Sequence, residues 1–292
     1  MSKPLRRLSF GLQTLFGLAE RGYFIPARHA GARGAEDYPA LRPLFEAAEP
    51  QFQAVLEAIE GFCGALAALG GPAPAPRFEQ TWFPRLDAAA AYALVRQRQP
   101  ARIVEIGSGH STRFLARAAS DEGFACRIDC IDPAPRAAVA PLPVTHHRTS
   151  LAGADPALLR GLAAGDILFI DSSHVAMPGS DVDRLLLDCL PRLPAGVLVH
   201  IHDVLLPDAY PERWRWRGYN EQLLVGCLLQ GGGFALRFAS RYVATVMAGR
   251  WRQGPIARLP LPAGAYETSL WLETRRPSTR NAQAPETPRQ SK

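Results

Sequence analysis

The chain has 292 residues, of which 47% are hydrophobic, and a formal net charge of +6, which suits one large α/β domain or one such domain with a smaller appendage. All basic residues except Lys3 and Lys292 are arginines, and they are scattered without a block of like charges, so no nucleic-acid partner is expected. The five cysteines form no Cys-x-x-Cys pair, which argues against a zinc site or a disulfide framework and indicates a reducing, cytoplasmic setting.

The N-terminal stretch combines basic and apolar residues. Three basic residues within the first seven precede a partly apolar segment, residues 8–19, which Gln13 and Thr14 interrupt. No small-x-small cleavage site follows, so a secretory signal peptide is not expected. The segment can form a helix that packs on the main domain or one that lies on a membrane surface, and the first interpretation is the simpler.

The first third of the chain has the pattern of a helical region. Apolar residues recur at helical spacing over residues 50–69, where two glycines end the pattern. A proline-rich connector follows over residues 71–76, and Asp87 can then cap an alanine-rich helix over residues 88–96. We therefore predict an N-terminal helical extension over residues 1–98.

Beyond Arg102, short apolar runs alternate with helical patterns. Four of these runs predict buried strands, namely Ile103–Gly107, Arg127–Asp132, Ile167–Asp171 and Val197–His202. Their near-continuous hydrophobicity is typical of parallel strands that are covered on both faces. Residues 234–239 and 268–272 are expected to add the last strands, with an antiparallel edge strand. The pattern predicts an α/β fold with a Rossmann-like, doubly wound and mostly parallel sheet.

Two further segments complete the organisation of the chain. Ser180 and Asp183 form the expected capping pair of a helix that follows the third predicted strand. The tail over residues 276–292 is polar and contains several prolines, so we expect it to be disordered.

The strongest chemical signal is the run VEIGSGHST over residues 104–112, in which a strand ends at Gly107 and a helix starts near Ser111. Glycines in such a turn let the backbone approach a ligand closely, and the helix N-terminus offers free N–H groups. Asp132 ends the next strand, where its carboxylate can accept hydrogen bonds from both ribose hydroxyls of an adenosine cofactor.

The type of adenosine cofactor follows from two positions in this run. A dinucleotide site requires a third glycine where Thr112 stands. Glu105 would repel a pyrophosphate, whereas it suits the amino group of a cationic amino-acid moiety. A NAD(P)-dependent oxidoreductase therefore remains only an alternative, as does a non-catalytic module that keeps the fold.

The pattern E-x-G-x-G-x-S resembles the cofactor motif of class I S-adenosylmethionine-dependent methyltransferases. Residues 101–230 resemble a bacterial methyltransferase family related to catechol and sugar O-methyltransferases. The matching segments are residues 105–109, FIDSSH at 169–174, GVLVHIHD at 196–203, and the shorter pieces at 210–211 and 219–222. This resemblance implies a methyltransferase domain over residues 99–275 that methylates a small molecule or saccharide, most simply at oxygen.

The resemblance also implies the residues of the site. The implied contacts to S-adenosyl-L-methionine are Glu105, Gly107, Ser108, Gly109, Ser111, Asp132, Ser150 and Asp171. In metal-dependent relatives the corresponding positions of Asp171, His202 and Asp203 hold a divalent metal ion. His202 departs from the usual oxygen ligand and is less suited to magnesium, which leaves manganese, zinc, iron or no metal.

Six of the seven histidines lie between residues 110 and 202. Methyl transfer from a sulfonium is an in-line displacement, for which positioning alone can supply ~7–11 kcal/mol. If the acceptor is a hydroxyl, an imidazole of near-neutral pKa can remove its proton. His174 and His202 are the candidates for this base, with Asp171 as their catalytic neighbour, although each histidine could instead hydrogen-bond a loop. His146 and His147 are expected to be structural or near the adenine.

Four aromatic residues follow the fourth predicted strand, namely Tyr210, Trp214, Trp216 and Tyr219. They could line the acceptor pocket or form a lid over it. They could equally pack the N-terminal helices onto the core, and the sequence leaves both interpretations open.

Overall fold

A computed structural model describes residues 3–19 and 36–275 of the protein. The chain divides into two compact units, residues 1–35 and 36–292. The first unit contains the helix α1 (Lys3–Leu15). The predicted disordered tail lies outside the described residues. Within the described ranges no helix is long and apolar enough to cross a membrane.

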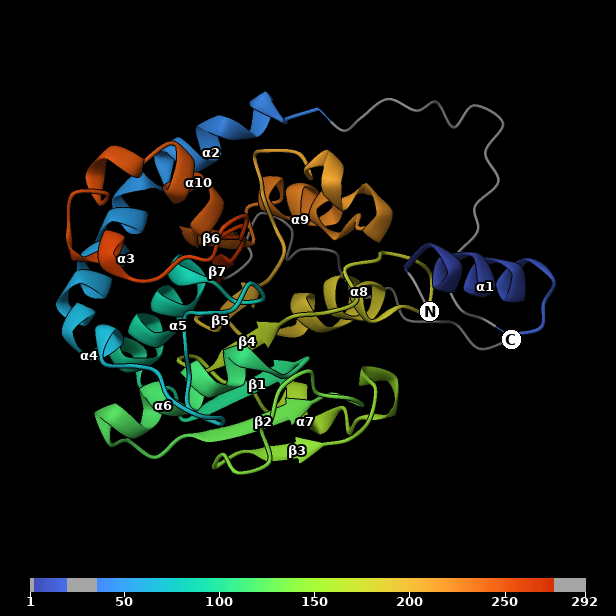
Figure 1. Ribbon diagram of the computed structural model, residues 1–292, viewed down its shortest axis with the longest axis horizontal. Helices are drawn as coiled ribbons and strands as arrows, with labels where there is room; N and C mark the ends of the chain where they lie inside the picture. Colours follow the sequence, from blue (N-terminus) through green and yellow to red (C-terminus); the bar gives the residue numbers. More distant parts are fainter. Residues whose placement is uncertain (1–2, 20–35, 276–292) are drawn as a thin grey trace, which may run out of the picture. The chain divides into compact units, whose positions relative to one another are not determined.

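The second unit is built around a sheet of seven strands in the order β3-β2-β1-β4-β5-β7-β6 (Figure 1). The strands are β1 (Arg102–Ile106), β2 (Arg127–Ile131), β3 (Thr145–His147), β4 (Ile167–Ile170), β5 (Leu198–Ile201), β6 (Phe234–Ala239) and β7 (Leu270–Thr274). Strands β1 to β5 pair in parallel, and β7 runs antiparallel between β5 and β6. The predicted mostly parallel sheet with antiparallel pairing at one edge is therefore confirmed.

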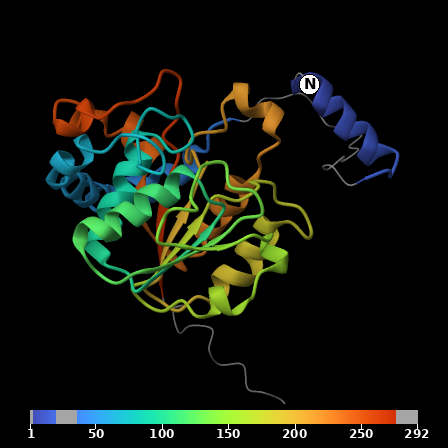
Figure 2. The same cartoon turned by 60° about the horizontal axis from the view of Figure 1, so that its bottom comes forward.

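Helices cover both faces of this sheet (Figure 2). Their bounds are α2 (Arg42–Ala47), α3 (Glu49–Gly61), α4 (Cys63–Ala67), α5 (Arg85–Arg98), α6 (His110–Glu122), α7 (Ala157–Arg160), α8 (Asp181–Arg184), α9 (Glu221–Gln230) and α10 (Ser240–Thr245). Helix α5 packs against both α3 and α6, and α3 also contacts β6. Residues 36–98 thus belong to the same compact unit as the sheet. The domain boundary at residue 98 stays a prediction.

Two expectations about helix ends have different outcomes. Ser180 does cap α8, because its hydroxyl accepts a hydrogen bond of 3.1 Å from the N–H of Asp183. The expected cap at Asp87 is wrong, since α5 already begins at Arg85 and Asp87 lies buried in its first turn. The Asp87 carboxylate instead accepts hydrogen bonds from the N–H groups of Thr268, at 3.0 Å, and Ser269, at 2.8 Å. It therefore ties α5 to the segment that leads into β7.

The central strands β1, β4 and β5 are almost entirely buried, as their apolar sequences require. All six predicted strands are present, with ends that agree to within two residues. Strand β3 was not predicted, because its three residues, Thr-His-His, contain no apolar run. The carboxyl ends of β1, β2, β4 and β5 lie at one edge of the sheet, where open α/β folds bind their ligands.

Candidate functional site

The loop after β1 needs glycine at its first position. Gly107 has a φ of +78°, and a Cβ atom there would overlap the backbone oxygen of Asp171 at the end of the adjacent strand β4. Gly109 differs, because its backbone is extended and nothing lies within 4 Å of the position of a Cβ. The loop therefore closes against the sheet at Gly107 and leaves open space at Gly109, directly before α6.

Glu105 holds this loop in place through side-chain hydrogen bonds. Its side chain is fully buried and accepts hydrogen bonds of 2.6 Å from the hydroxyls of Ser111 and Thr112, and a longer one of 3.3 Å from the Cys130 thiol. Burial raises the pKa of Glu105 to about 7, although these three donors counteract the rise. Glu105 thus joins β1 to the first turn of α6. The direct contacts of Glu105 and Ser111 with a cofactor stay predictions.

Asp132 follows β2 and faces the glycine loop, while its predicted contact with the ribose of a cofactor stays a prediction. Its Oδ2 accepts hydrogen bonds from the N–H of Ser108, at 2.7 Å, and from the Ser108 hydroxyl, at 3.1 Å. Its Oδ1 accepts a further bond of 2.7 Å from the N–H of Ala134. Since a carboxylate offers about four lone-pair sites, one acceptor position remains for a ligand.

The residues around β3 have structural contacts. Nε2 of His146 lies 2.9 Å from the backbone oxygen of Asp132, and Nε2 of His147 lies 3.0 Å from Oδ1 of Asp129. These contacts agree with a structural role for both histidines. Ser150 is exposed and precedes the short turn Leu151–Gly153, so its contact with a cofactor stays a prediction.

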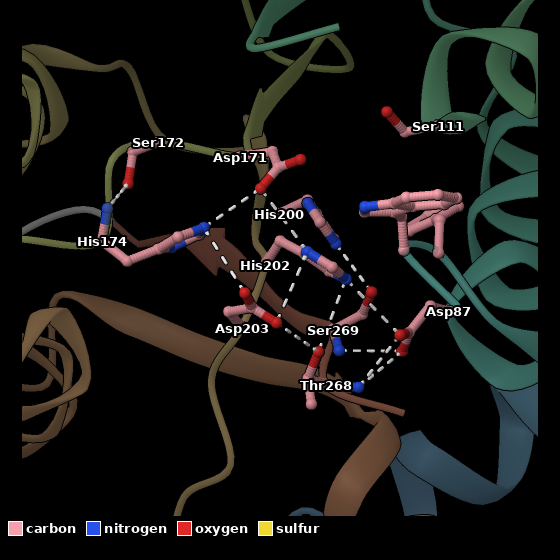
Figure 3. A network of polar contacts seen from close by, with 12 residues as sticks. Asp87, Ser111, Asp171, Ser172, His174, His200, His202, Asp203, Thr268 and Ser269 are labelled. Atoms are coloured by element: carbon pink, nitrogen blue, oxygen red, sulfur yellow. Dashed lines mark hydrogen bonds and ion pairs between the residues drawn. The ribbon is translucent and has the colours of Figure 1, made fainter. Parts of the chain in front are cut away.

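Four predicted residues meet in one place, which we call the His–Asp cluster: Asp171, His174, His202 and Asp203. Figure 3 shows their side chains pointing toward one another. Nε2 of His174 lies 3.2 Å from Oδ1 of Asp171 and 3.6 Å from Oδ2 of Asp203. Nδ1 of His202 lies 3.5 Å from Oδ1 of Asp171 and 3.8 Å from Oδ1 of Asp203. Each histidine therefore faces both aspartates.

Two residues of the His–Asp cluster have strained backbone conformations. His174 and Asp203 have positive φ values of 61° and 53°, in the left-handed region that residues other than glycine rarely adopt. Such residues cost about 1–3 kcal/mol each and concentrate at functional sites. The two strained positions of the cluster thus follow β4 and β5, at the ligand-binding edge of the sheet.

A second layer of carboxylates orients the histidines, and the sequence did not reveal it. Oε2 of the fully buried Glu221 lies 2.8 Å from Nδ1 of His174, and the Ser172 hydroxyl donates to both Glu221 oxygens at 3.1 Å. Oδ2 of Asp87 lies 3.6 Å from Nε2 of His202. Each imidazole is therefore flanked by carboxylates on both sides. Glu221 lies in a segment that carried the family resemblance, whereas Asp87 was expected only as a helix cap.

These carboxylates decide the protonation of the cluster. Burial alone would lower the pKa of His174, but hydrogen bonds to Asp171 and Glu221 raise it to about 10. Burial also opposes the rise for His202, yet the charge of Asp203 and contacts with Asp171 and Asp87 hold its pKa well above the usual value. In return, the two histidines keep the pKa of Asp171 well below normal, against the effect of burial. The carboxylates thus favour the protonated form of both imidazoles, whereas the sequence led us to expect a base of near-neutral pKa.

The predicted metal ligands lie inside this cluster. Across the described ranges, no group of three or more His, Cys, Asp or Glu side chains is arranged to hold a metal ion. Both ring nitrogens of His174 and of His202 face carboxylates, as they do when each ring carries two protons. The ligand set Asp171, His202 and Asp203 stays a prediction.

The aromatic loop after β5 reaches the cluster through Tyr219, whose ring centroid lies 4.6 Å from that of His174. Arg217 contacts Asp203 at 3.3 Å, and its guanidinium lies 4.0 Å from the ring centroid of Trp214. The ring centroid of Tyr210 lies 6.1 Å from that of Tyr219, so Tyr210 belongs to the same aromatic group. These contacts agree with the interpretation of the loop as a lining of the site.

A second aromatic pair, missed in the sequence, lies on the loop before α5. The buried Phe83 ring lies 5.6 Å from the His202 ring, while the neighbouring Trp82 stacks parallel to His110 at 5.5 Å and remains 56% exposed. Oε1 of Gln80 accepts hydrogen bonds from the N–H groups of Trp82 and Phe83, which fixes the loop. Because His110 directly follows Gly109, this pair connects the glycine loop with the His–Asp cluster.

Residues 104–204 match the family model described as a methyltransferase domain. This segment is similar to a methyltransferase domain. It contains Glu105, the glycine loop, Asp132 and the whole His–Asp cluster. The match favours the methyltransferase interpretation over the nicotinamide-dependent alternative. A comparison with curated protein sequences gives no match.

Several solved structures are distantly similar to the chain. A methyltransferase from Podospora anserina with bound S-adenosylhomocysteine has 15% identity and a TM-score of 0.40, covering 87% of this chain and 99% of that one. An O-methyltransferase from Bacillus cereus has 14% identity and a TM-score of 0.38, covering 76% and 91%. A branched-chain polyamine synthase from Thermus thermophilus has 15% identity and a TM-score of 0.40, covering 76% and 65%. At this distance the similarities carry no statement about the reaction.

Proposed function

We propose that the protein transfers the methyl group of S-adenosylmethionine to a hydroxyl group of a small molecule or saccharide. One observation carries this proposal. The glycine loop and Asp132, from β1 and β2, lie at the same sheet edge as the His–Asp cluster from β4 and β5, within the methyltransferase domain. A donor on the first pair of strands and an acceptor on the second would then lie side by side.

The cofactor would cross the loop where the structure leaves space. Its ribose would use the remaining acceptor position of Asp132, and its methionine part would pass over Gly109 toward Asp171. Glu105 would support the cofactor indirectly, because its carboxylate already holds Ser111 and Thr112. The NH groups at the start of α6 would remain available to the methionine carboxylate.

The reaction would form a bond between the acceptor oxygen and the methyl carbon while the bond from that carbon to sulfur breaks, releasing S-adenosylhomocysteine. His174 is the residue we assign to the acceptor proton, since Glu221 fixes its ring and its Nε2 faces the site. His174 can take up this proton only in its neutral form, which its raised pKa disfavours near neutral pH, so the proposed transfer would speed up as the pH rises toward about 10.

A divalent ion at Asp171, His202 and Asp203 would supply Lewis-acid stabilisation of the acceptor oxygen. The donor arrangement does not fit such an ion as it stands, because no three of the His, Cys, Asp and Glu side chains in the described ranges are arranged to hold one. No step of the proposed reaction passes through a metal.

The test is transfer of a tritium-labelled methyl group from S-adenosylmethionine to a panel of saccharides and phenols, with and without EDTA. His174→Gln should lower the rate by roughly 10²–10⁴-fold, the usual range for loss of a general base. His147→Gln is the matched control, because His147 contacts Asp129 outside the cluster, and it should retain the rate. Full activity of His174→Gln, loss of activity in EDTA, or transfer only to amines would contradict the proposed chemistry.

A further inference from the structure

Helix α1 has an unusual distribution of charge. Its 13 residues include Lys3, Arg6 and Arg7 and no acidic residue. The described part of the first unit is therefore a positively charged helix.

One side of α1 is apolar and open to solvent. Leu5, Leu8, Leu12 and Leu15 follow one another at intervals of three or four residues, which places them on one face of the helix. Their exposed fractions are 57%, 60%, 43% and 56%. Phe16, at 69%, continues the apolar surface beyond the helix end. Soluble monomers rarely leave such a contiguous apolar face uncovered.

The other side of α1 carries Arg6 together with the aromatic Phe10. With 100° between successive residues, positions 6 and 10 fall away from the leucine face. The Arg6 guanidinium lies 5.2 Å from the ring centroid of Phe10, and the side-chain amide of Gln13 donates a hydrogen bond of 3.1 Å to the Ser9 hydroxyl. The helix thus separates four leucines from a basic and hydrogen-bonding side.

We propose that α1 binds an anionic lipid surface, with the leucine face in the interface and the basic side toward the headgroups. A short helix with an apolar face, a cationic polar face and no acidic residue is the form that interfacial helices take. Its charge complements anionic lipids, which attract each nearby basic residue. With 13 residues it is too short to span a bilayer and would lie in the surface. This interaction is independent of the proposed methyl transfer.

The experiment is co-sedimentation of the full chain with vesicles of phosphatidylcholine alone or mixed with phosphatidylglycerol, at low and high salt. We expect sedimentation with the anionic vesicles only, weakened by salt. Leu8→Ser combined with Leu12→Ser should reduce partitioning on the order of thirtyfold, because two partly buried leucines are lost. Arg6→Gln should reduce it roughly fivefold.

The matched control replaces two exposed leucines of the second unit, Leu187 at 68% and Leu223 at 51%, by serine. This control should sediment like the unsubstituted chain. The proposal is overturned if the chain does not sediment with anionic vesicles, if neutral vesicles bind it equally well, or if the control loses as much binding as the α1 variant. It is also overturned if the α1 variant lowers the thermal unfolding temperature, because α1 would then cover the protein's own core.

Discussion

Replacing Asp132 by alanine should weaken S-adenosylhomocysteine binding by an amount that the structure limits. Three of the lone-pair positions of Asp132 are used by Ser108 and by the N–H of Ala134, so one charged hydrogen bond to the ribose remains available. A hydrogen bond to a charged group is worth about 1.5–3 kcal/mol. The dissociation constant should therefore rise roughly 10- to 150-fold.

Calorimetric titration with S-adenosylhomocysteine measures this change directly. Asp155→Ala is the matched control, because Asp155 also accepts a hydrogen bond from the N–H two residues ahead, that of Ala157, at 2.8 Å, but lies on an exposed turn. The control should leave the affinity unchanged. Unchanged affinity in a folded Asp132→Ala protein would refute the assignment of the ribose to Asp132. A loss well beyond 150-fold would mean that both ribose hydroxyls bind this carboxylate, at the expense of Ser108.

Four further variants test other parts of the account. Gly107→Ala should destabilise the protein by more than about 2 kcal/mol in denaturant unfolding, because its Cβ would overlap the backbone of Asp171. Gly109→Ala should leave the free energy of unfolding unchanged but weaken S-adenosylhomocysteine binding, because only open space surrounds the position of its Cβ. An equal loss of stability in the two glycine variants would contradict the open space at Gly109. Burial raises the pKa of Glu105 from 4.5 to about 7, so the folded state favours the protonated carboxyl. The free energy of unfolding of the wild type should therefore fall by about 3 kcal/mol relative to that of Glu105→Gln as the pH rises from below 4.5 to above 7. A difference between the two proteins that stays constant with pH would contradict this. Asp87→Ala should cost about 2–5 kcal/mol in thermal or denaturant unfolding, since two buried N–H groups lose their acceptor.

The parts of the site that were predicted from the sequence depend on local patterns. A glycine turn between an apolar run and a helix start places Gly107, and the end of each apolar run places Asp132, Asp171 and Asp203. Because parallel strands end at the same edge of a sheet, these residues had to converge. The structure confirms that convergence in the His–Asp cluster.

The remaining features depend on contacts between distant segments. Glu221 approaches His174 from α9, and Asp87 approaches His202 from α5, so these two contributions to the raised histidine pKa values could not be read from the sequence near the histidines. Trp82 reaches the glycine loop only because Gln80 folds its loop back. Strand β3 was missed because it is short and polar, and it forms through pairing with β2.

The most direct test of the central claim is calorimetric titration of the full chain with S-adenosylmethionine and S-adenosylhomocysteine, with NAD as the competing ligand. The account predicts binding of the first two with an affinity that Asp132→Ala reduces, and no binding of NAD. Binding of NAD alone, or binding of none of the three to the folded protein, would contradict the assignment of the loop at Gly107–Gly109 to S-adenosylmethionine.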